Sequence, residues 1–209
     1  MNDYALLTDF DGTVTTINVL DSLYEQFAGP SYRIHMERWN RGEISTMEEI
    51  EKIFSTVEAS RQGMEAFLRT VNIDPGFKPL LGYCREKTYP FAIVSDGLRW
   101  YIDYVLNTHG IERTNVYAGD IFFEEEGFRF EYPWFDPAFP LRSTAKPVIV
   151  KEYQRRGHRV IFVGDGLSDV EAAEIADVVY AKDVLLEISR ERGIEAREFE
   201  DLFDVYQDL

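Results

Sequence analysis

Three short segments of this chain each place a carboxylate beside glycine or a hydroxyl residue. They are Asp9-Phe10-Asp11-Gly12-Thr13, Ser95-Asp96-Gly97 and Gly164-Asp165-Gly166-Leu167-Ser168-Asp169. Carboxylates gathered in one place repel one another unless a cation lies among them. Hard oxygen ligands without a thiolate or histidine cluster favour Mg²⁺. These residues therefore predict a metal-dependent site, provided that the fold brings the three segments together.

Each of these segments follows a short apolar run. Such runs, free of charge and rich in β-branched or aromatic residues, are typical of parallel strands buried on both faces. Four runs occur, at 4–7, 91–94, 160–163 and 178–181, and helical patterns lie between them at 100–107, 148–155 and 169–175. This alternation predicts an α/β fold with a doubly wound, Rossmann-like parallel sheet. Because ligands bind outside the carboxyl ends of such strands, we expect one crevice that collects all three segments.

Taken singly, these residues have ordinary structural explanations. An Asp-Gly pair usually marks a turn, and Asp165, Asp169 or Ser95 alone suits the N-terminus of a helix. The occurrence of all three segments after buried strands is what favours a functional site over helix capping.

The segment 16–77 contains no strand-like run. It predicts helices over 20–27, 32–41, 46–54 and 62–71, and Ser45-Thr46-Met47-Glu48 fits a capping box for the third of them. We interpret 16–77 as a helical cap domain inserted after the first strand, over the carboxyl edge of a core formed by 1–15 and 78–209.

A different pattern occupies residues 115–143. Residues 128–132 alternate strictly between apolar and polar side chains, and Glu126-Gly127 favours a turn back toward 121–123. The pattern predicts a β-hairpin inserted into the core.

The overall charge excludes some classes of partner. Among 209 residues, 22 Lys and Arg stand against 38 Asp and Glu, which gives a formal net charge of −16. Such a polyanion repels nucleic acids and anionic membrane surfaces. No apolar run approaches the roughly 18 residues of a membrane span, and the first residues, Met1 to Tyr4, do not read as a signal peptide. A single cysteine, Cys84, allows no intrachain disulfide. We expect a cytoplasmic protein; the sequence carries no signal for its oligomeric state.

The three segments, in this order, resemble motifs of the haloacid dehalogenase superfamily in its phosphatase form. Segment 9–13 resembles the first motif, 94–97 the second and 164–169 the fourth. The third motif is a lysine upstream of the fourth, for which Lys146 is the best match and Lys151 a competitor. A helical insertion after the first motif resembles the cap of the branch that includes phosphoserine phosphatases.

This resemblance implies a role for each residue. Asp9 would be the nucleophile that forms an aspartyl-phosphate, and Asp11 the acid that protonates the leaving oxygen and then deprotonates water. Mg²⁺ would be held by Asp9, the main-chain carbonyl of Asp11, and Asp165. The residues implied to bind the phosphoryl group are Ser95, Asp96, Gly97, Lys146 and Thr13. Asp169 and Gly166 are implied to lie next to the metal ligands without binding the metal, and Asp169 would orient a metal-bound water or Lys146. Because dehalogenases of the family lack an acid two residues after the nucleophile, Asp11 points to phosphate chemistry.

The substrate implied is a small phosphorylated metabolite. Residues 160–186 are similar to methionine-salvage phosphatases, which act on 2-hydroxy-3-keto-5-methylthiopentenyl-1-phosphate, although this chain lacks the cysteine-rich segment that some of them carry. Phosphoserine phosphatases have a glutamate where this chain has Asn18, whereas phosphocholine and phosphoethanolamine phosphatases have an asparagine. Basic cap residues, Arg33 and Arg38 among them, favour an anionic or polar substrate unless they form an exposed helix face.

A reading from another class is a phospho-accepting signalling receiver. Receivers also combine acidic residues, a hydroxyl residue and a lysine on a parallel sheet, but they are usually shorter and lack a helical insertion after the first strand. The acyl phosphate would persist in a receiver, whereas a phosphatase would hydrolyse it.

Overall fold

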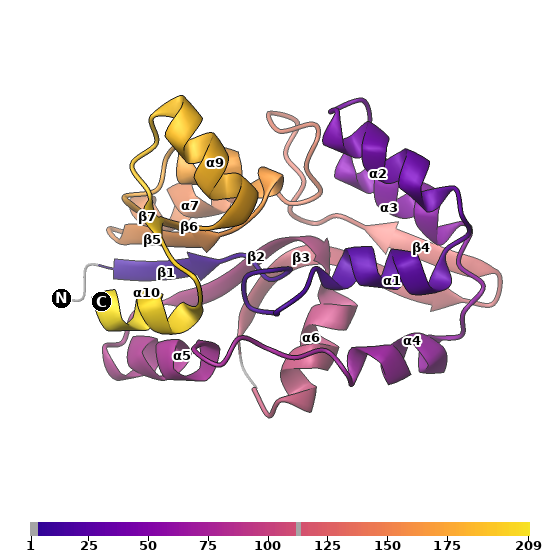
Figure 1. Cartoon of the computed structure of the whole chain (residues 1–209), viewed down its shortest axis with the longest axis horizontal. Helices are drawn as coiled ribbons and strands as arrows, with labels where there is room; N and C mark the ends of the chain where they lie inside the picture. Colours follow the sequence, from indigo (N-terminus) through magenta and orange to yellow (C-terminus); the bar gives the residue numbers. More distant parts are fainter. Residues whose placement is uncertain (1–3, 112–113) are drawn as a thin grey trace.

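A computed structural model describes residues 4–111 and 114–209 (Figure 1). Residues 1–3, which belong to the predicted core segment 1–15 and to the N-terminal stretch considered above, lie outside the described residues. The described residues form one sheet of seven strands in the order β4-β3-β2-β1-β5-β6-β7. The strands are β1 (Tyr4–Thr8), β2 (Phe91–Leu98), β3 (Asn115–Glu124), β4 (Gly127–Glu131), β5 (Arg159–Gly164), β6 (Val178–Ala181) and β7 (Arg197–Glu198).

Every pairing in this sheet is parallel except that of β3 with β4. The helices are α1 (Val19–Phe27), α2 (Tyr32–Asn40), α3 (Thr46–Phe54), α4 (Arg61–Leu68), α5 (Phe77–Glu86), α6 (Arg99–Thr108), α7 (Lys146–Arg155), α8 (Val170–Ala173), α9 (Asp183–Arg192) and α10 (Leu202–Asp208), with a 3₁₀ turn, η1, at Leu167–Asp169. In the part of the chain that the structure covers, no helix is long and apolar enough to cross a membrane.

Both faces of the sheet are covered by helices. Leu6 packs in a cluster with residues of α5, α6 and α10, whereas its neighbours Ala5 and Leu7 pack with residues of α7. Figure 1 shows the two helix layers on opposite sides of β1. Successive side chains of a strand point to opposite faces, so a strand buried on both sides reads as a continuous apolar run. The predicted doubly wound α/β sheet is confirmed.

The helical segment α1–α4 leaves and rejoins the sheet region at one place. Thr15 and Ile73 form an antiparallel bridge, and the amide of Asp74 donates to the carbonyl of Val14 at 2.8 Å. The two ends of the segment therefore lie side by side, as an insertion requires. Phe10 and Val14 share one apolar cluster with Leu23 and Tyr24 of α1. The division into a core and a cap domain remains a prediction.

The predicted hairpin is present as β3 and β4, with Phe123 opposite Phe128 and Glu124 opposite Gly127. Its first strand is longer than expected, because residues 115–119 pair in parallel with β2 before the hairpin begins. The apolar run in this stretch, Val116-Tyr117-Ala118, is only three residues long, shorter than the four-residue runs that predicted the other parallel strands, which hid this part of the strand. Gly119 leaves room for the ring of Tyr132, which would lie 3.1 Å from a Cβ placed there.

The predicted capping box of α3 is also present. The Ser45 hydroxyl accepts from the amide of Glu48 at 3.2 Å, and the Glu48 carboxylate accepts from the amide of Ser45 at 3.0 Å. This reciprocal pair satisfies two amides that the helix itself leaves without partners. It fixes the start of a helix that carries Thr46 and Glu49 toward the site described below.

We predict that Ser45→Ala lowers the free energy of unfolding by about 1 kcal/mol, because an amide at the start of α3 loses its acceptor. Urea unfolding measures the change. Ser31→Ala is the matched control, since Ser31 precedes α2 without a side-chain capping bond, and we expect a change within about 0.5 kcal/mol. Equal effects of the two substitutions would contradict the capping role.

Candidate active site

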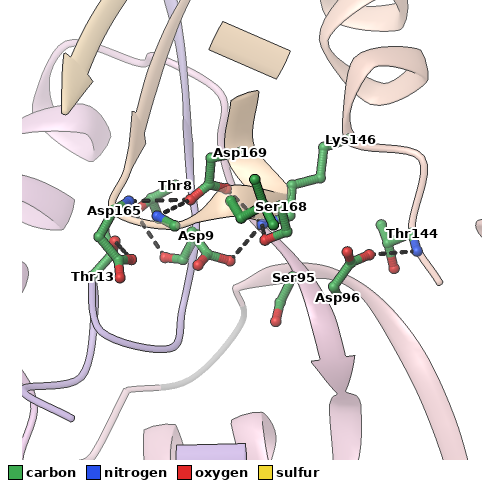
Figure 2. Close-up of polar contacts among 12 residues, drawn as sticks. Thr8, Asp9, Thr13, Ser95, Asp96, Thr144, Lys146, Asp165, Ser168 and Asp169 are labelled. Atoms are coloured by element: carbon green, nitrogen blue, oxygen red, sulfur yellow. Dashed lines mark hydrogen bonds and ion pairs between the residues drawn. The ribbon is translucent and has the colours of Figure 1, made fainter. Parts of the chain in front are cut away.

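Lys146 connects two of the predicted motifs. Its ammonium donates to Asp9 Oδ1 at 2.7 Å and to Asp169 Oδ1 at 2.6 Å, and to the Ser168 hydroxyl at 3.3 Å (Figure 2). Lys146 is the first residue of α7 and is fully buried, whereas Lys151 on the same helix is exposed. Among the two candidate lysines, the structure brings only Lys146 to the carboxylates.

Burial and charge act against each other in this cluster. Burial raises the pKa of the Asp9 carboxyl well above its usual range, and the Asp169 carboxylate adds to the increase, while the Lys146 ammonium opposes it. Burial alone would discharge Lys146, but Asp169 and Asp9 outweigh burial and raise the pKa of the lysine. The ammonium therefore stays charged and offsets part of the negative charge at the ends of the strands.

Asp165 and Asp169 follow β5 and complete an oxygen-rich cluster with Asp9. One carboxylate oxygen from each of these three residues lies within 4.8 Å of the others. Asp169 Oδ2 accepts from the amides of Asp165 and Gly166, at 3.1 and 3.0 Å. Asp169 is thus occupied by Lys146 and by the loop, which leaves Asp9 and Asp165 as the open carboxylates.

Asp165 is held from the other side by the first motif. The Thr13 hydroxyl donates to Asp165 Oδ1 at 2.5 Å. Gly12 lies beside it with a positive φ of 79°, and a Cβ there would come 2.5 Å from Asp165 Oδ2. Both the backbone conformation and the space require glycine. Burial, reinforced by Asp169, raises the pKa of Asp165 to about 7. A divalent cation among Asp9 and Asp165 would relieve this accumulation of charge, so the residues fit a bound Mg²⁺.

Asp11 is fixed by three donors. Its Oδ1 accepts from the amides of Val19 and Leu20 at the start of α1, at 2.9 and 3.3 Å, and its Oδ2 accepts from the Tyr101 hydroxyl at 2.5 Å. Burial raises the pKa of Asp11, as an acid catalyst near neutral pH requires, although these hydrogen bonds oppose the increase. Tyr101 reaches Asp11 only because residue 97 is glycine: a Cβ there would lie 1.6 Å from the tyrosine oxygen.

Ser95 and Asp96 lie in β2, which continues through the second motif. The Ser95 hydroxyl accepts from the amide of Gly97 at 3.0 Å and lines the cavity. The Asp96 carboxylate accepts from the hydroxyl of Ser143 and the amide of Thr144, at 3.1 and 2.8 Å. Its contacts brace the loop that leads to Lys146. The phosphate-binding role that the motif implies for Asp96 remains a prediction.

The basic cap residues are not brought to the site. Arg33 is exposed and folds onto the ring and hydroxyl of Tyr32, while Arg38 pairs with Glu43 at 3.4 Å. Neither lines the cavity above Asp9. Asn18 does line it, but its side chain caps α1 by accepting from the amide of Asp21 at 2.9 Å. The expectation that Arg33 and Arg38 face the substrate is therefore not supported, because each has a local partner.

Sequence reasoning missed three residues of this site: Tyr101, Asp21 and Glu49. Tyr101 looked like an ordinary apolar position of the helix after β2. Glu49 had a usable signal, since it occupies a position of the buried face of α3 with Ile50, Ile53 and Phe54. A carboxylate on an apolar helix stripe is rarely buried without a reason.

The family of this chain is shown by its similarity to known proteins. The family described as haloacid dehalogenase-like hydrolase matches residues 6–174. The chain belongs to that family, and the predicted class of enzyme, a phosphatase of the haloacid dehalogenase type, is confirmed.

Two curated relatives illustrate the similarity. The 2-hydroxy-3-keto-5-methylthiopentenyl-1-phosphate phosphatase of Bacillus pumilus is 27% identical over 94% of this chain and 87% of its own length. The bifunctional enzyme MtnB/MtnX of Bacillus licheniformis is 29% identical over 96% of this chain, which spans about half, 48%, of that longer protein.

Solved structures of phosphoserine phosphatase share the fold. One, a phospho-aspartyl intermediate analogue, has a TM-score of 0.77 at 17% identity and covers all of both chains. A substrate-bound complex has a TM-score of 0.75 at 17% identity, covering all of this chain and 99% of the other.

We predict that Lys146→Met lowers the free energy of unfolding at pH 7 by about 3 kcal/mol, because it leaves Asp9 and Asp169 buried beside each other without their cation. The deficit should shrink at pH 5: a carboxyl whose pKa is raised in the folded state takes up a proton there and favours folding as the pH falls. Urea unfolding in excess chelator measures both values.

Lys151→Met is the control for this substitution, since Lys151 is exposed on the same helix, and we expect a change within about 0.5 kcal/mol. A Lys146→Met protein as stable as the control at pH 7 would show that the ammonium does not hold the carboxylates together.

Proposed function

We propose that this chain is a Mg²⁺-dependent phosphomonoester hydrolase that acts through an aspartyl-phosphate on Asp9. The observation that carries the proposal is the contact of Lys146 with Asp9 at 2.7 Å, in a cluster that also contains Asp165 and Asp169. Three segments that are far apart in the sequence, at 9–11, at Lys146 and at 165–169, supply one nucleophile, one ammonium and an oxygen-rich metal site.

Mg²⁺ would be held by Asp9, the main-chain carbonyl of Asp11, and Asp165. When bound, it would supply positive charge that neutralises phosphoryl oxygens. The chain's own contribution to charge is Lys146, with amide donors at the ends of β1 and β2. Because a body of net charge −16 repels a phosphate dianion, attraction of the substrate must come from this local positive charge.

In the first half of the reaction, an Asp9 carboxylate oxygen forms a bond to phosphorus as the bond from phosphorus to the leaving oxygen breaks. Lys146 engages Oδ1, so Oδ2 is the oxygen free to attack. Asp11 transfers its proton to the leaving oxygen, which departs as an alcohol. Tyr101 and the first amides of α1 keep the Asp11 carboxyl aimed during this transfer.

In the second half, the Asp11 carboxylate takes a proton from water while the water oxygen forms a bond to phosphorus. The bond from phosphorus to Asp9 breaks, which releases inorganic phosphate and restores the Asp9 carboxylate. Asp11 regains its proton for the next cycle. A receiver would lack this step, and the family match and helical insertion favour the hydrolase.

The substrate is a small phosphorylated metabolite. The names of the curated relatives support 2-hydroxy-3-keto-5-methylthiopentenyl-1-phosphate as a candidate. Phosphocholine, phosphoethanolamine and phosphoserine are the alternatives from the sequence. The cavity above Asp9, about 140 Å³, suits such small molecules. A cytoplasmic location, where these metabolites occur, remains part of the proposal.

We expect the protein with Mg²⁺ to hydrolyse p-nitrophenyl phosphate and at least one of these four metabolites, measured as released inorganic phosphate. Excess chelator should lower turnover by at least about a hundredfold, and added Mg²⁺ should restore it. Asp9→Asn should abolish it. Full turnover in excess chelator, or by Asp9→Asn, would reject the proposed chemistry.

A second prediction distinguishes a role of Asp11 as the acid that protonates the leaving group from a purely structural role. Asp11→Asn should lower kcat for alkyl phosphates by at least about a hundredfold, because their leaving groups need a proton. The loss on p-nitrophenyl phosphate should be much smaller, since that leaving group is stable as an anion. Tyr101→Phe should shift the same ratio in the same direction but less. Equal losses of Asp11→Asn on alkyl and aryl phosphates would contradict the acid role.

A further inference from the structure

The cavity above Asp9 has a floor and a wall of different origin. Its floor holds Asp9, Asp11, Ser95 and Asp165 from the ends of the strands. Its wall comes from α1, α2 and α3 and from Asn18, which directly precedes α1. The wall residues are Asn18, Leu20, Asp21, Met36, Trp39, Asn40, Thr46 and Glu49. No Lys, Arg or His lines the cavity anywhere in the described chain. The wall therefore carries two acidic side chains, Asp21 and Glu49, and no basic side chain lines the cavity beside them.

Glu49 is the most unusual residue of this wall. Its side chain is only 5% exposed, on the buried face of α3 beside Ile50 and Ile53. Within the described residues its carboxylate has no hydrogen bond and no salt bridge, unlike Asp9 and Asp11 of the floor. Burial raises its pKa to about 8, with the Asp21 and Asp96 carboxylates adding to the increase. A buried carboxylate without a partner is costly, and its free side faces the cavity.

Asp21 adds a second carboxylate from a different helix. No cation of residues 4–111 and 114–209 pairs with it, and burial, reinforced by Asp11, raises its pKa to about 6. The nearby arginines are committed elsewhere, Arg38 and Arg41 to Glu43 and Arg33 to Tyr32. Two acids from separate helices that face one cavity, both without partners, are stabilised together by a positive charge between them.

The remaining wall suits an organic cation better than a metal ion. Trp39 is fixed at the wall by a hydrogen bond from its indole nitrogen to the Thr46 hydroxyl at 2.9 Å, and Met36 and Leu20 lie beside it. Aromatic and thioether groups favour the C–H surface of an alkylammonium group, and indole is the best of the aromatic partners for a cation. A neutral hydroxyl would hydrogen-bond to the carboxylates but would not offset their repulsion.

We propose that the preferred substrates are phosphomonoesters whose leaving alcohol carries an ammonium group, which binds between Glu49 and Asp21 while the phosphate lies over Asp9. The inference rests on the proposed function and narrows its substrate class. Under this proposal the ammonium group is recognised by Asp21 and Glu49 and not by Asn18, whose side-chain amide caps α1. An enol phosphate, which has no ammonium group, should have a lower kcat/KM than an aminoalkyl phosphate.

Two substrates of nearly equal size test the proposal: 2-aminoethyl phosphate and 2-hydroxyethyl phosphate, each assayed with Mg²⁺ at pH 7.5. We expect the wild-type kcat/KM to favour the amine by at least about tenfold. Glu49→Gln should lower this ratio by about tenfold, chiefly through KM for the amine, and Asp21→Asn should lower it in the same direction. Glu25→Gln, which removes an exposed carboxylate of α1 that does not line the cavity, should leave the ratio unchanged.

The outcomes separate this inference from the proposed function. Hydrolysis of p-nitrophenyl phosphate together with no wild-type preference for the amine would overturn the inference alone. An equal ratio in Glu49→Gln and Glu25→Gln, with thermal unfolding showing both proteins folded, would also overturn it. No turnover of any phosphomonoester with Mg²⁺ would reject both. The wild-type preference for the amine is measured without any variant. The inference can therefore be overturned even if Glu49→Gln does not fold.

Discussion

The site depends on the ammonium of Lys146 between Asp9 and Asp169. Carboxylates from the ends of β1, β2 and β5 meet at one edge of the sheet, where burial disfavours their charged forms and where they repel one another. Lys146 contacts both Asp9, the proposed nucleophile, and Asp169, whose carboxylate holds the loop of the fourth motif. Its charge makes the cluster compatible with folding, and the same charge lies where a phosphoryl group would need it.

The parallel sheet makes this convergence unavoidable. Strands that run the same way end at the same edge, so the segments after β1, β2 and β5 must meet. Small residues then set the distances. Gly12 allows Asp165 to approach the first motif, and Gly97 allows the Tyr101 hydroxyl to reach Asp11. Asp96, on the motif of Ser95, braces the loop before Lys146. Each of these short segments therefore contains both residues that hold the site in shape and residues that would take part in the reaction.

Much of this arrangement was predictable from residue pattern, because buried parallel strands read as apolar runs and motif residues follow them directly. The capping box of α3 was predictable too, since it is local. Features that depend on tertiary neighbours were not. The first half of β3 has an apolar run of only three residues, Val116 to Ala118. The sequence also does not reveal that the Arg33 guanidinium packs on the ring of Tyr32. The position of Tyr101 over Gly97 depends on how α6 packs, and no local pattern encodes that packing.

The central claim is that the Asp9 side chain is transiently phosphorylated. Rapid acid quenching of the protein during turnover of a ³²P-labelled phosphomonoester, followed by peptide mapping, tests it most directly. The account predicts label on the peptide containing Asp9 that appears within the first turnover, then decays to inorganic phosphate, and persists longer in Asp11→Asn. Label on another residue, or release of phosphate with no labelled protein at any quench time, would contradict it.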